Sequence, residues 1–510
     1  MNSQNIIVIG AGLGGMTTAI HLAQQGLRVT VIEKNGRAGG RCDQISREGH
    51  RFDTGPTLLV MPLLYEQEFA SLGVNMRDVL DLQRVDPTYH LVFDDGSKLA
   101  LTSDMNALET QMEAIEPGSF QGLLRYLEEG HRHYHLGIER LVNKDFRKAT
   151  EFFNLRNLPL LTQLKPAMHH YSHMSSFFDS PRLKAAFTFQ DVYMGLSPFE
   201  APATFSLMPY SELAHGVWYP KGGMYQVANA LFEIAQQAGV EFMFDTAVSQ
   251  IDVVGNKTRG VVLENDRFLQ SDAVVANADL PYVYNNLLPK SKMAKKLNKK
   301  RFSCSVISFF WGVDKQYTDL PPHTLFLADD YKENFDSIID DLTIPDNPSI
   351  YVHAPTRLDP SMAPAGQDTI IGIVPVGHMN EAELQDWRAI RDQARESVFQ
   401  RLATIGITDL QDHIKFETNF SPLSWKKRYN LMKGSTHGLC HNMTQLGYLR
   451  PQNRHPHYKN LYFVGASTHP GTGMPTAMVS GRLAAVRLLE EQMEVGKKTA
   501  VSTFPIPQTA

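Results

Sequence analysis

A glycine-rich turn near the amino terminus constrains the fold of this chain more than any other feature. Residues 6–9 are apolar and predict a short strand, and Gly10, Gly12 and Gly15 follow it in the spacing G-x-G-x-x-G. In this spacing the first glycine permits a tight turn. The second lets the backbone approach a pyrophosphate, and the third lets the following helix pack on the strand. Residues 16–25 predict that helix, so the segment predicts a strand–turn–helix unit that binds a dinucleotide.

An acidic residue after the next strand supports this interpretation. Gly26 ends the predicted helix, residues 27–32 predict a second strand, and Glu33 follows directly. An acid about 20 residues beyond the glycines accepts hydrogen bonds from a ribose. The helix start also presents unpaired N–H groups to phosphates. A lone glycine triplet occurs in ordinary turns, but the strand, helix, second strand and acid together favour a cofactor site.

Length and composition narrow the class of protein. The chain has 510 residues, enough for two or three structural units, and 43% of them are hydrophobic. A formal net charge of −5 argues against a general nucleic-acid binder. Cys42, Cys304 and Cys440 are widely separated, which predicts reduced thiols in a cytoplasmic protein. We find no apolar run long enough to predict a membrane-spanning helix.

Residues 33–41 indicate that the cofactor is a flavin rather than a nicotinamide dinucleotide. They read E-K-N-G-R-A-G-G-R, which resembles an extension found in the large FAD family that holds amine oxidases, protoporphyrinogen oxidase and carotenoid desaturases. The resemblance implies that Gly39 and Gly40 lie close to the flavin phosphates. It also implies that Arg41 contacts a phosphate or the ribityl chain. The alternative is a plain basic, glycine-rich loop.

The carboxyl-terminal region narrows the resemblance to one branch of that family. Residues 460–475 match the bacterial carotenoid desaturase signature N-L-Y-x-V-G-x-x-T-H-P-G-x-G-x-P. Residues 52–57 resemble F-D-x-G-P-T, and residues 216–223 resemble G-V-W-x-P-x-G-G. The matches extend from residue 6 to about residue 488. The chain therefore resembles the bacterial phytoene desaturase-like carotenoid desaturase and oxidase family, which includes diapophytoene desaturases.

This resemblance implies an FAD-dependent oxidoreductase that desaturates a linear carotenoid precursor such as phytoene or diapophytoene. Residues 194–202 lean towards the diapophytoene or methyl-oxidising branch. Three alternatives stay open: a terminal-methyl oxidase or isomerase of the same fold, an amine oxidase-like enzyme, and a non-catalytic flavin-binding lipid carrier. The implied partners are a polyene lipid, the cytoplasmic membrane face, and oxygen or a quinone as electron acceptor.

The implied fold is α/β, with a discontinuous Rossmann-type FAD-binding domain, a mixed-sheet substrate domain and a helical lid that associates with the membrane. We assign 1–100, 216–300 and 451–495 to the FAD-binding domain, 101–215 to the lid, 301–450 to the substrate domain and 496–510 to a flexible tail. Residues 105–215 are rich in aromatics, which either line a lipid entrance or pack in a core. The expected location is therefore cytoplasmic, at the inner face of the cell membrane.

The fingerprint and the resemblance together predict the cofactor contacts. They are Gly10, Gly12, Gly14, Gly15, Glu33, Lys34, Gly39, Gly40, Arg41, Gly55, Pro56, Thr57, Val248, Gly465, Thr468, Gly473 and Met474. His469, beside the last glycine-rich turn, is the candidate ionisable group near the ring, although a histidine here also suits local packing. The histidines at 131, 133 and 135 and at 169, 170 and 173 lack the acid of H-E-x-x-H, so we predict no metal site.

Overall fold

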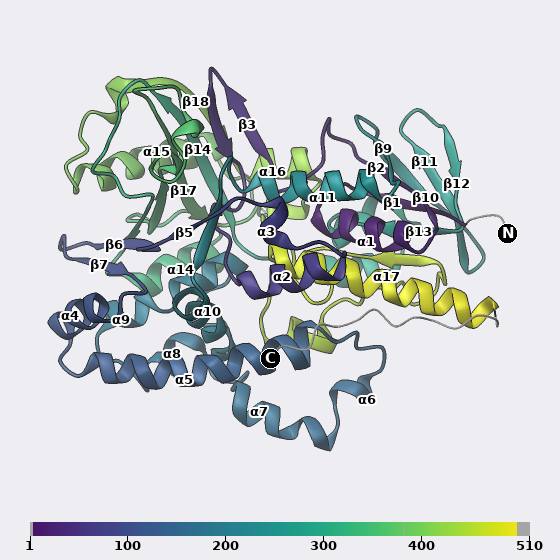
Figure 1. Cartoon of the computed structure of the whole chain (residues 1–510), viewed down its shortest axis with the longest axis horizontal. Helices are drawn as coiled ribbons and strands as arrows, with labels where there is room; N and C mark the ends of the chain where they lie inside the picture. Colours follow the sequence, from purple (N-terminus) through teal and green to yellow (C-terminus); the bar gives the residue numbers. More distant parts are fainter. Residues whose placement is uncertain (1–3, 382, 497–510) are drawn as a thin grey trace.

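The computed structural model describes residues 4–381 and 383–496, and the predicted tail from residue 497 onwards lies outside them. The first layer is a parallel five-stranded sheet in the order β19-β13-β1-β2-β9 (Figure 1). Its strands are β1 (Asn5–Ile9), β2 (Arg28–Ile32), β9 (Glu241–Met243), β13 (Ala273–Ala276) and β19 (Leu461–Phe463). Chain segments more than 400 residues apart thus share one sheet.

The central strand β1 is buried on both faces, which explains its unbroken apolar run. Ile6 and Val8 pack in a core with α1 (Leu13–Gln24). Ile7 and Ile9 pack on the other side with a three-stranded sheet of β10 (Val248–Val254), β11 (Lys257–Leu263) and β12 (Phe268–Gln270). Parallel strands covered on both faces are apolar at every position rather than at alternate ones.

Helix α1 starts earlier than the predicted residue 16, because Gly14 and Gly15 already lie in its first turn. It lies beside the last helix, α17 (Met474–Gly496), as Figure 1 shows for the purple and yellow helices. Helices α1 and α17 pack closely, and Thr18 Oγ1 donates to the carbonyl of Gly481 at 3.2 Å. A Cβ atom on Gly481 would lie 2.4 Å from the carbonyl oxygen of Gly14.

A seven-stranded mixed sheet forms the second layer, in the order β18-β14-β17-β16-β15-β6-β7. Its strands are β6 (Tyr89–Phe93), β7 (Lys98–Leu101), β14 (Ser305–Val313), β15 (His323–Leu327), β16 (Ile350–His353), β17 (Asp368–Val376) and β18 (Ile414–Phe420). The β6–β7 hairpin comes from residues 1–100 yet pairs with β15. The domain bounds themselves stay a prediction.

The remaining elements frame these sheets. Two small sheets pair β3 (Gln44–Arg47) with β4 (His50–Asp53) and β5 (Leu82–Val85) with β8 (Val217–Pro220). Besides α1 and α17, the α-helices described outside residues 101–215 are α2 (Pro62–Ser71), α3 (Met76–Val79), α11 (Tyr225–Gln237), α12 (Leu280–Tyr282), α13 (Lys292–Asn298), α14 (Tyr331–Ile339), α15 (Trp387–Ala403) and α16 (Pro422–Tyr429). The Asp386 side chain caps the start of α15 by accepting from the amides of Arg388 and Ala389.

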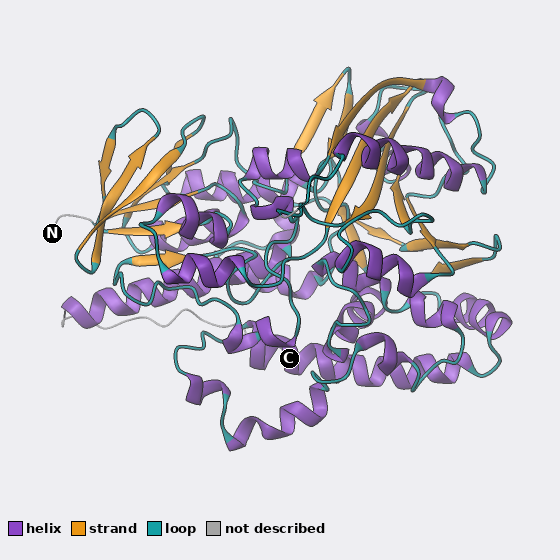
Figure 2. Cartoon of the chain, turned by 180° about the vertical axis from the view of Figure 1, so that it is seen from behind, coloured by secondary structure: helices purple, strands orange, loops and turns teal. Residues whose placement is uncertain are grey.

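A helical region lies along one side of both sheets (Figures 1 and 2). It contains α4 (Met105–Ile115), α5 (Ser119–Gly137), α6 (Ala149–Phe152), α7 (Leu158–Leu164), α8 (His170–Met174), α9 (Pro181–Ala186) and α10 (Leu207–His215). Within residues 4–381 and 383–496, no helix combines the length and the apolar character that crossing a bilayer requires.

The contact between α1 and α17 makes a stability prediction. We expect Gly481→Ala to lower the free energy of unfolding by about 1–3 kcal/mol, because the new methyl group meets backbone that cannot move aside. Gly137→Ala is the matched control, since its Cβ would lie 3.4 Å from a Leu207 methyl group, an ordinary contact. Denaturant unfolding of both variants measures the difference, and equal stabilities would contradict the close packing.

Candidate functional site

One large cavity joins the carboxyl ends of the parallel strands to the seven-stranded sheet and the helical region. Its volume is about 1530 Å³. Pockets for a single small ligand usually measure about 300–1,000 Å³. The cavity is therefore large enough for a cofactor and a second extended ligand together.

Most of the predicted cofactor residues line this cavity. They are Gly10, Gly12, Gly14, Glu33, Lys34, Gly39, Gly40, Arg41, Gly55, Pro56, Thr57, Val248, Gly465, Gly473 and Met474. Gly15 and Thr468 do not line it. A Cβ on Gly15 would lie 2.2 Å from the carbonyl oxygen of Gly10, so Gly15 shapes the turn from behind. Thr468 is buried, and its hydroxyl donates to the carbonyl of Gly465 at 2.8 Å.

Asn277, at the end of β13, organises the glycine turn. Its amide nitrogen Nδ2 donates to the carbonyl of Gly10 at 3.1 Å. A Cβ on Gly10 would lie 2.6 Å from the Asn277 carbonyl oxygen, and one on Gly12 would lie 2.9 Å from Nδ2. Gly10 also has a φ of 96°, which favours glycine. Asn277 was not among the predicted site residues, although it ends a strand that pairs with β1, where doubly wound sheets bind ligands.

Glu33 lies at the end of β2 and is almost fully buried at the cavity wall. One carboxylate oxygen accepts from the amide of Ala11 at 2.9 Å. The other accepts from the backbone and side-chain nitrogens of Asn35 at 2.8 and 2.9 Å. These donors fix the carboxylate beside the glycine turn. The arrangement suits the predicted role of accepting hydrogen bonds from a ribose.

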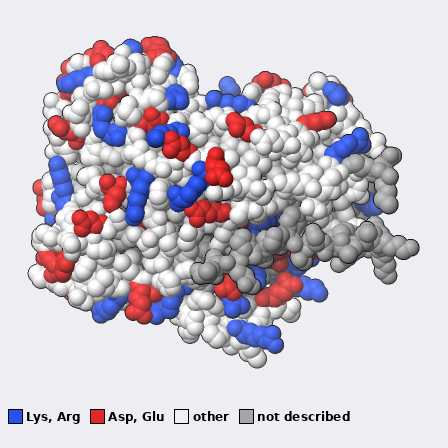
Figure 3. Space-filling view, viewed as in Figure 1, with Lys and Arg blue, Asp and Glu red and all other residues white. Residues whose placement is uncertain are grey.

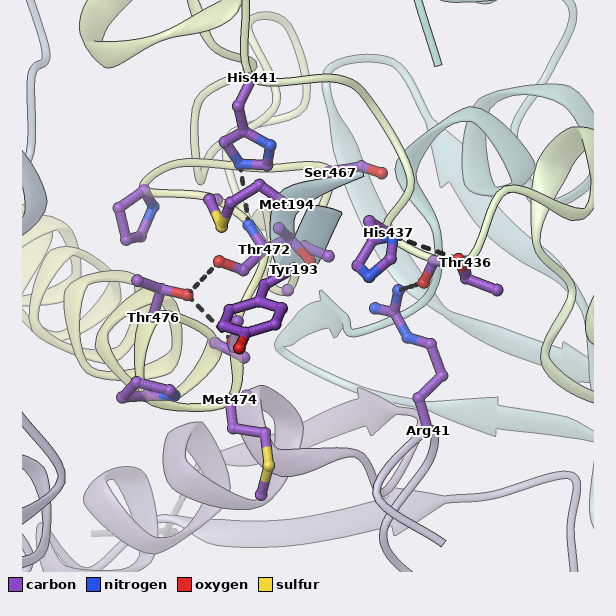
Figure 4. A pocket seen from close by; sticks show the side chains of 18 of the residues that line it. Arg41, Tyr193, Met194, Thr436, His437, His441, Ser467, Thr472, Met474 and Thr476 are labelled. Carbon is purple, nitrogen blue, oxygen red and sulfur yellow. Dashed lines mark hydrogen bonds between the residues drawn. The ribbon is translucent and has the colours of Figure 1, made fainter. Parts of the chain in front are cut away.

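The glycine pair and Arg41 extend the same wall. The amide of Gly39 donates to the carbonyl of Ala11, and a Cβ on Gly40 would lie 3.2 Å from the Cα of Gly12. Arg41 Nη1 donates to the carbonyl of Thr436 at 2.7 Å, a bond drawn in Figure 4. Burial lowers the pKa of Arg41, while the negative charge of Asp279 raises it. Arg41 thus places a cation at the cavity wall.

Arg450 holds together the two carboxyl-terminal segments that cover the cavity. Its guanidinium is buried and donates to backbone carbonyls of residues 439, 440, 445, 466 and 468. Burial lowers its pKa to about 9. His441 adds a second link, because its Nε2 accepts from the amide of Thr472 at 3.0 Å (Figure 4). Arg450 is not among the predicted site residues.

His469 lines the cavity, but the contacts of its ring are local. Nε2 bonds the carbonyl of Lys144 at 2.7 Å, and the ring packs edge-on against Phe146. Burial lowers its pKa to about 4, so the ring is neutral at pH 7. Nδ1 is buried and has no hydrogen-bond partner in the described part of the chain. The role of His469 as an ionisable group near the ring stays a prediction.

Asp53, the acid of the segment that resembles F-D-x-G-P-T, does not line the cavity. Its carboxylate accepts from the amides of Met224 and Tyr225 at the start of α11, at 2.8 and 3.2 Å. Burial raises its pKa to about 6, and these hydrogen bonds oppose that rise. Asp53 therefore joins β4 to α11.

Much of the remaining lining is aromatic or aliphatic, and a small group of hydroxyls lies within it. Thr57, Tyr89, Tyr193 and Tyr351 line its wall. The Tyr351 hydroxyl bonds Thr57 Oγ1 at 2.8 Å and His323 Nδ1 at 2.6 Å, and the Tyr89 and Tyr193 hydroxyls bond each other. Towards the helical region, Phe153, Leu155, Leu158 and Leu161 both line the cavity and are exposed to solvent. This end of the cavity suits a long apolar ligand.

The glycine turn formed by Gly10, Gly12 and Gly14, which we call the glycine cradle, fits a flavin dinucleotide. The added Cβ atoms at Gly10, Gly12 and Gly14 would meet neighbouring atoms within 3.0 Å, so only glycines allow these segments to meet here. No side chain caps the first turn of α1, which leaves amides available for phosphate oxygens. Among the described residues, no group of three or more His, Cys, Asp or Glu side chains is placed to hold a metal ion.

Curated relatives match the chain over nearly its full length. It is 41% identical to a phytoene desaturase from Fusarium fujikuroi, covering 96% of this chain and 90% of the relative. It is 39% identical to a zeta-carotene-forming phytoene desaturase from Myxococcus xanthus, covering 98% and 97%. It is 33% identical to a 4,4′-diapophytoene desaturase from Staphylococcus haemolyticus, covering 96% and 100%.

A family model and a solved structure agree with these relatives. The model of the flavin containing amine oxidoreductases matches residues 13–489. An oxidoreductase from Methanosarcina mazei has the same fold, with a TM-score of 0.63 at 16% identity, covering 95% of this chain and all of the other.

The cradle makes a prediction about cofactor retention. We expect Gly12→Val to reduce bound flavin at least about tenfold, because the side chain enters the space at the turn and meets Asn277. Visible flavin absorbance relative to protein absorbance measures the loss. Thr17→Val is the matched control on the same helix, since Thr17 does not line the cavity. A folded Gly12→Val protein with normal flavin content would overturn the assignment of this turn.

Proposed function

The chain belongs to the flavin-containing amine oxidoreductase family and to its phytoene desaturase relatives, and on that premise we propose that it is an FAD-dependent carotenoid desaturase. The observation that carries the proposal is one continuous cavity, which joins the glycine cradle to a long, mainly apolar part. We call this part the apolar chamber; it extends from Tyr193 and Tyr351 to Leu155 and Leu161. An amine substrate calls for polar or charged groups that orient its nitrogen. The chamber instead offers mainly aromatic and aliphatic side chains.

The proposed substrate is a linear polyene precursor. The identity of 41% to a phytoene desaturase, against 33% to a diapophytoene desaturase, favours the longer phytoene. This is contrary to the leaning of residues 194–202. Terminal-methyl oxidation and isomerisation on the same fold remain the second candidates. Residues 194–202 favour the diapophytoene or methyl-oxidising branch of the family. A lipid carrier without turnover is the least supported.

When bound, FAD supplies the acceptor for a hydride from the substrate. The chain's own residues do the rest. Glu33 and the glycines at 10, 12, 39 and 40 would hold the dinucleotide, and Arg41 would bind a phosphate or the ribityl chain. The apolar chamber would align the polyene and exclude water, so that reaction depends on positioning rather than on polar handles. Oxygen or a quinone would remove the electrons afterwards.

We also propose that residues 101–215 form a lid at the inner face of the cell membrane. Leu155 is 83% exposed, and Phe153, Leu158 and Leu161 are each more than half exposed. The same four side chains line the cavity, so they connect it to the outside. Figure 3 shows the lower protrusion, where α7 lies in Figure 1, as white surface crossed by a basic side chain. An apolar rim of this kind lets a lipid pass from a bilayer into the protein.

The substrate proposal is tested by product mass. We expect the holoenzyme, incubated without oxygen with phytoene, to bleach its flavin and to yield a product two hydrogens lighter. Diapophytoene is the comparison substrate. A product of unchanged mass would indicate isomerisation, and added oxygen would indicate methyl oxidation. If neither phytoene nor diapophytoene bleaches the flavin, the proposal is overturned.

The lid proposal is tested on vesicles of phosphatidylethanolamine and phosphatidylglycerol. We expect the triple variant Leu155→Ser, Leu158→Ser, Leu161→Ser to bind on the order of 10²-fold more weakly, because each exposed leucine contributes apolar area to insertion. The control is Val254→Ser with Phe268→Ser, two exposed apolar residues on the three-stranded sheet. Co-sedimentation measures binding. Equal binding by the triple variant and the wild type would contradict the lid.

A further inference from the structure

A buried carboxyl group lies behind the hydroxyls of the apolar chamber. Glu212 is on α10 and is 5% exposed. One of its carboxylate oxygens accepts from Gln190 Nε2 at 3.1 Å. The other, Oε1, has no hydrogen-bond partner among the residues that the structure describes. Burying an acceptor without a partner costs free energy, so such an atom in a native site calls for a functional explanation.

Tyr193 lies between this carboxyl group and the chamber. Its side chain lines the cavity, as Figure 4 shows, and its hydroxyl bonds that of Tyr89. Its hydroxyl also stabilises the charged form of Glu212. Glu212 itself does not line the cavity. Tyr193 is therefore a phenol of the cavity wall that interacts with the buried carboxyl group.

Tyr351, another phenol of the chamber wall, is less suited to this role. Its hydroxyl is already engaged by Thr57 at 2.8 Å and by His323 at 2.6 Å. Burial holds the pKa of His323 well below its ordinary value, so this histidine is a poor proton acceptor. His469 is also a poor proton acceptor, because burial lowers its pKa to about 4.

We propose that Tyr193 accepts the proton that the polyene loses during desaturation and passes its own hydroxyl proton to Glu212. This inference rests on the proposed desaturase function. One substrate hydrogen leaves with its electron pair to the flavin, which is reduced. The other leaves as a proton, and the electrons of its C–H bond form the new C=C bond. The proton on Glu212 is released when oxygen or a quinone, the acceptor already proposed, reoxidises the flavin and takes up electrons and protons.

The surroundings of Glu212 suit a proton acceptor near neutral pH. Burial raises its pKa to about 8, while Gln190 and Tyr193 lower it. Burial raises the pKa of the phenols of Tyr89 on β6 and Tyr126 on α5, and the negative charge of Glu212 also raises it. Asp191, next to Gln190, pairs instead with His170 at 2.9 Å. General bases work best when their pKa lies near the operating pH, and they contribute about 10²–10⁴-fold to a rate.

The test is the rate of flavin bleaching by phytoene in one anaerobic turnover of the holoenzyme. The wild-type rate should rise with pH through about 8, because the carboxylate form of Glu212 is the acceptor. Glu212→Gln and Tyr193→Phe should each lower the rate by about 10²-fold and remove this pH dependence. The double variant should be no slower than either single variant, because the two groups act as a unit.

Tyr126→Phe is the matched control, since this phenol interacts electrostatically with Glu212 but does not line the cavity. Its rate should stay within about twofold of the wild type. A second readout is independent of turnover: the carboxylic-acid C=O band of Glu212 in infrared spectra. It should titrate near pH 8, disappear in Glu212→Gln and titrate at higher pH in Tyr193→Phe, because Tyr193 stabilises the carboxylate.

The outcomes separate the two proposals. Normal bleaching with an unchanged pH profile in Glu212→Gln would overturn the proton route and leave the desaturase function standing. Loss of the pH dependence in Tyr126→Phe would also overturn it. If no polyene bleaches the flavin of the wild type, the desaturase function falls, and the proton route falls with it.

Discussion

The close approach of backbone segments at the β1–α1 turn is the constraint on which the rest of the structure depends. Gly10 and Gly12 meet Asn277 at the end of β13, Gly40 meets Gly12, and Gly481 of α17 meets Gly14. Three other parts of the chain thus touch one turn at distances that leave little or no room for a side chain. Because these contacts join sheet, loop and last helix, they set where the strand ends open into the cavity. The cofactor cradle and the packing of the first domain are therefore one feature.

The two ends of the cavity differ in the polarity of their lining, although the space between them is continuous. At the cradle end, Glu33 and Arg41 offer charge, and the glycine turns offer exposed backbone. At the chamber end the lining is aromatic and aliphatic. Arg450 joins two loops at the cavity without placing its charge in the chamber, because its guanidinium donates hydrogen bonds to backbone carbonyls of both loops. A polar dinucleotide and an apolar polyene can then share one continuous space.

Local sequence predicted the parts of the site that adjacent residues build. The fingerprint glycines, Glu33 and the Gly39–Gly40 pair depend on short spacings, and all except Gly15 line the cavity. Gly15 and Thr468 belong to the motifs but act behind the wall, and spacing alone does not show which side of a turn a residue faces. Asn277, Arg450 and the Tyr193–Glu212 pair depend on contacts across the fold. No short pattern marks them, and the pairing of β6 with β15 was hidden for the same reason.

An apolar substrate gives an enzyme few groups to recognise, so the protein must supply both position and proton transfer from its own interior. The burial that makes the chamber fit for a polyene also removes water from Glu212. Loss of water disfavours the carboxylate and raises its pKa towards neutrality. In a solvated site the same carboxyl group would be a weaker base, ionised well below neutral pH. The environment that admits the substrate is thus also the one that turns an ordinary carboxyl group into a useful proton acceptor.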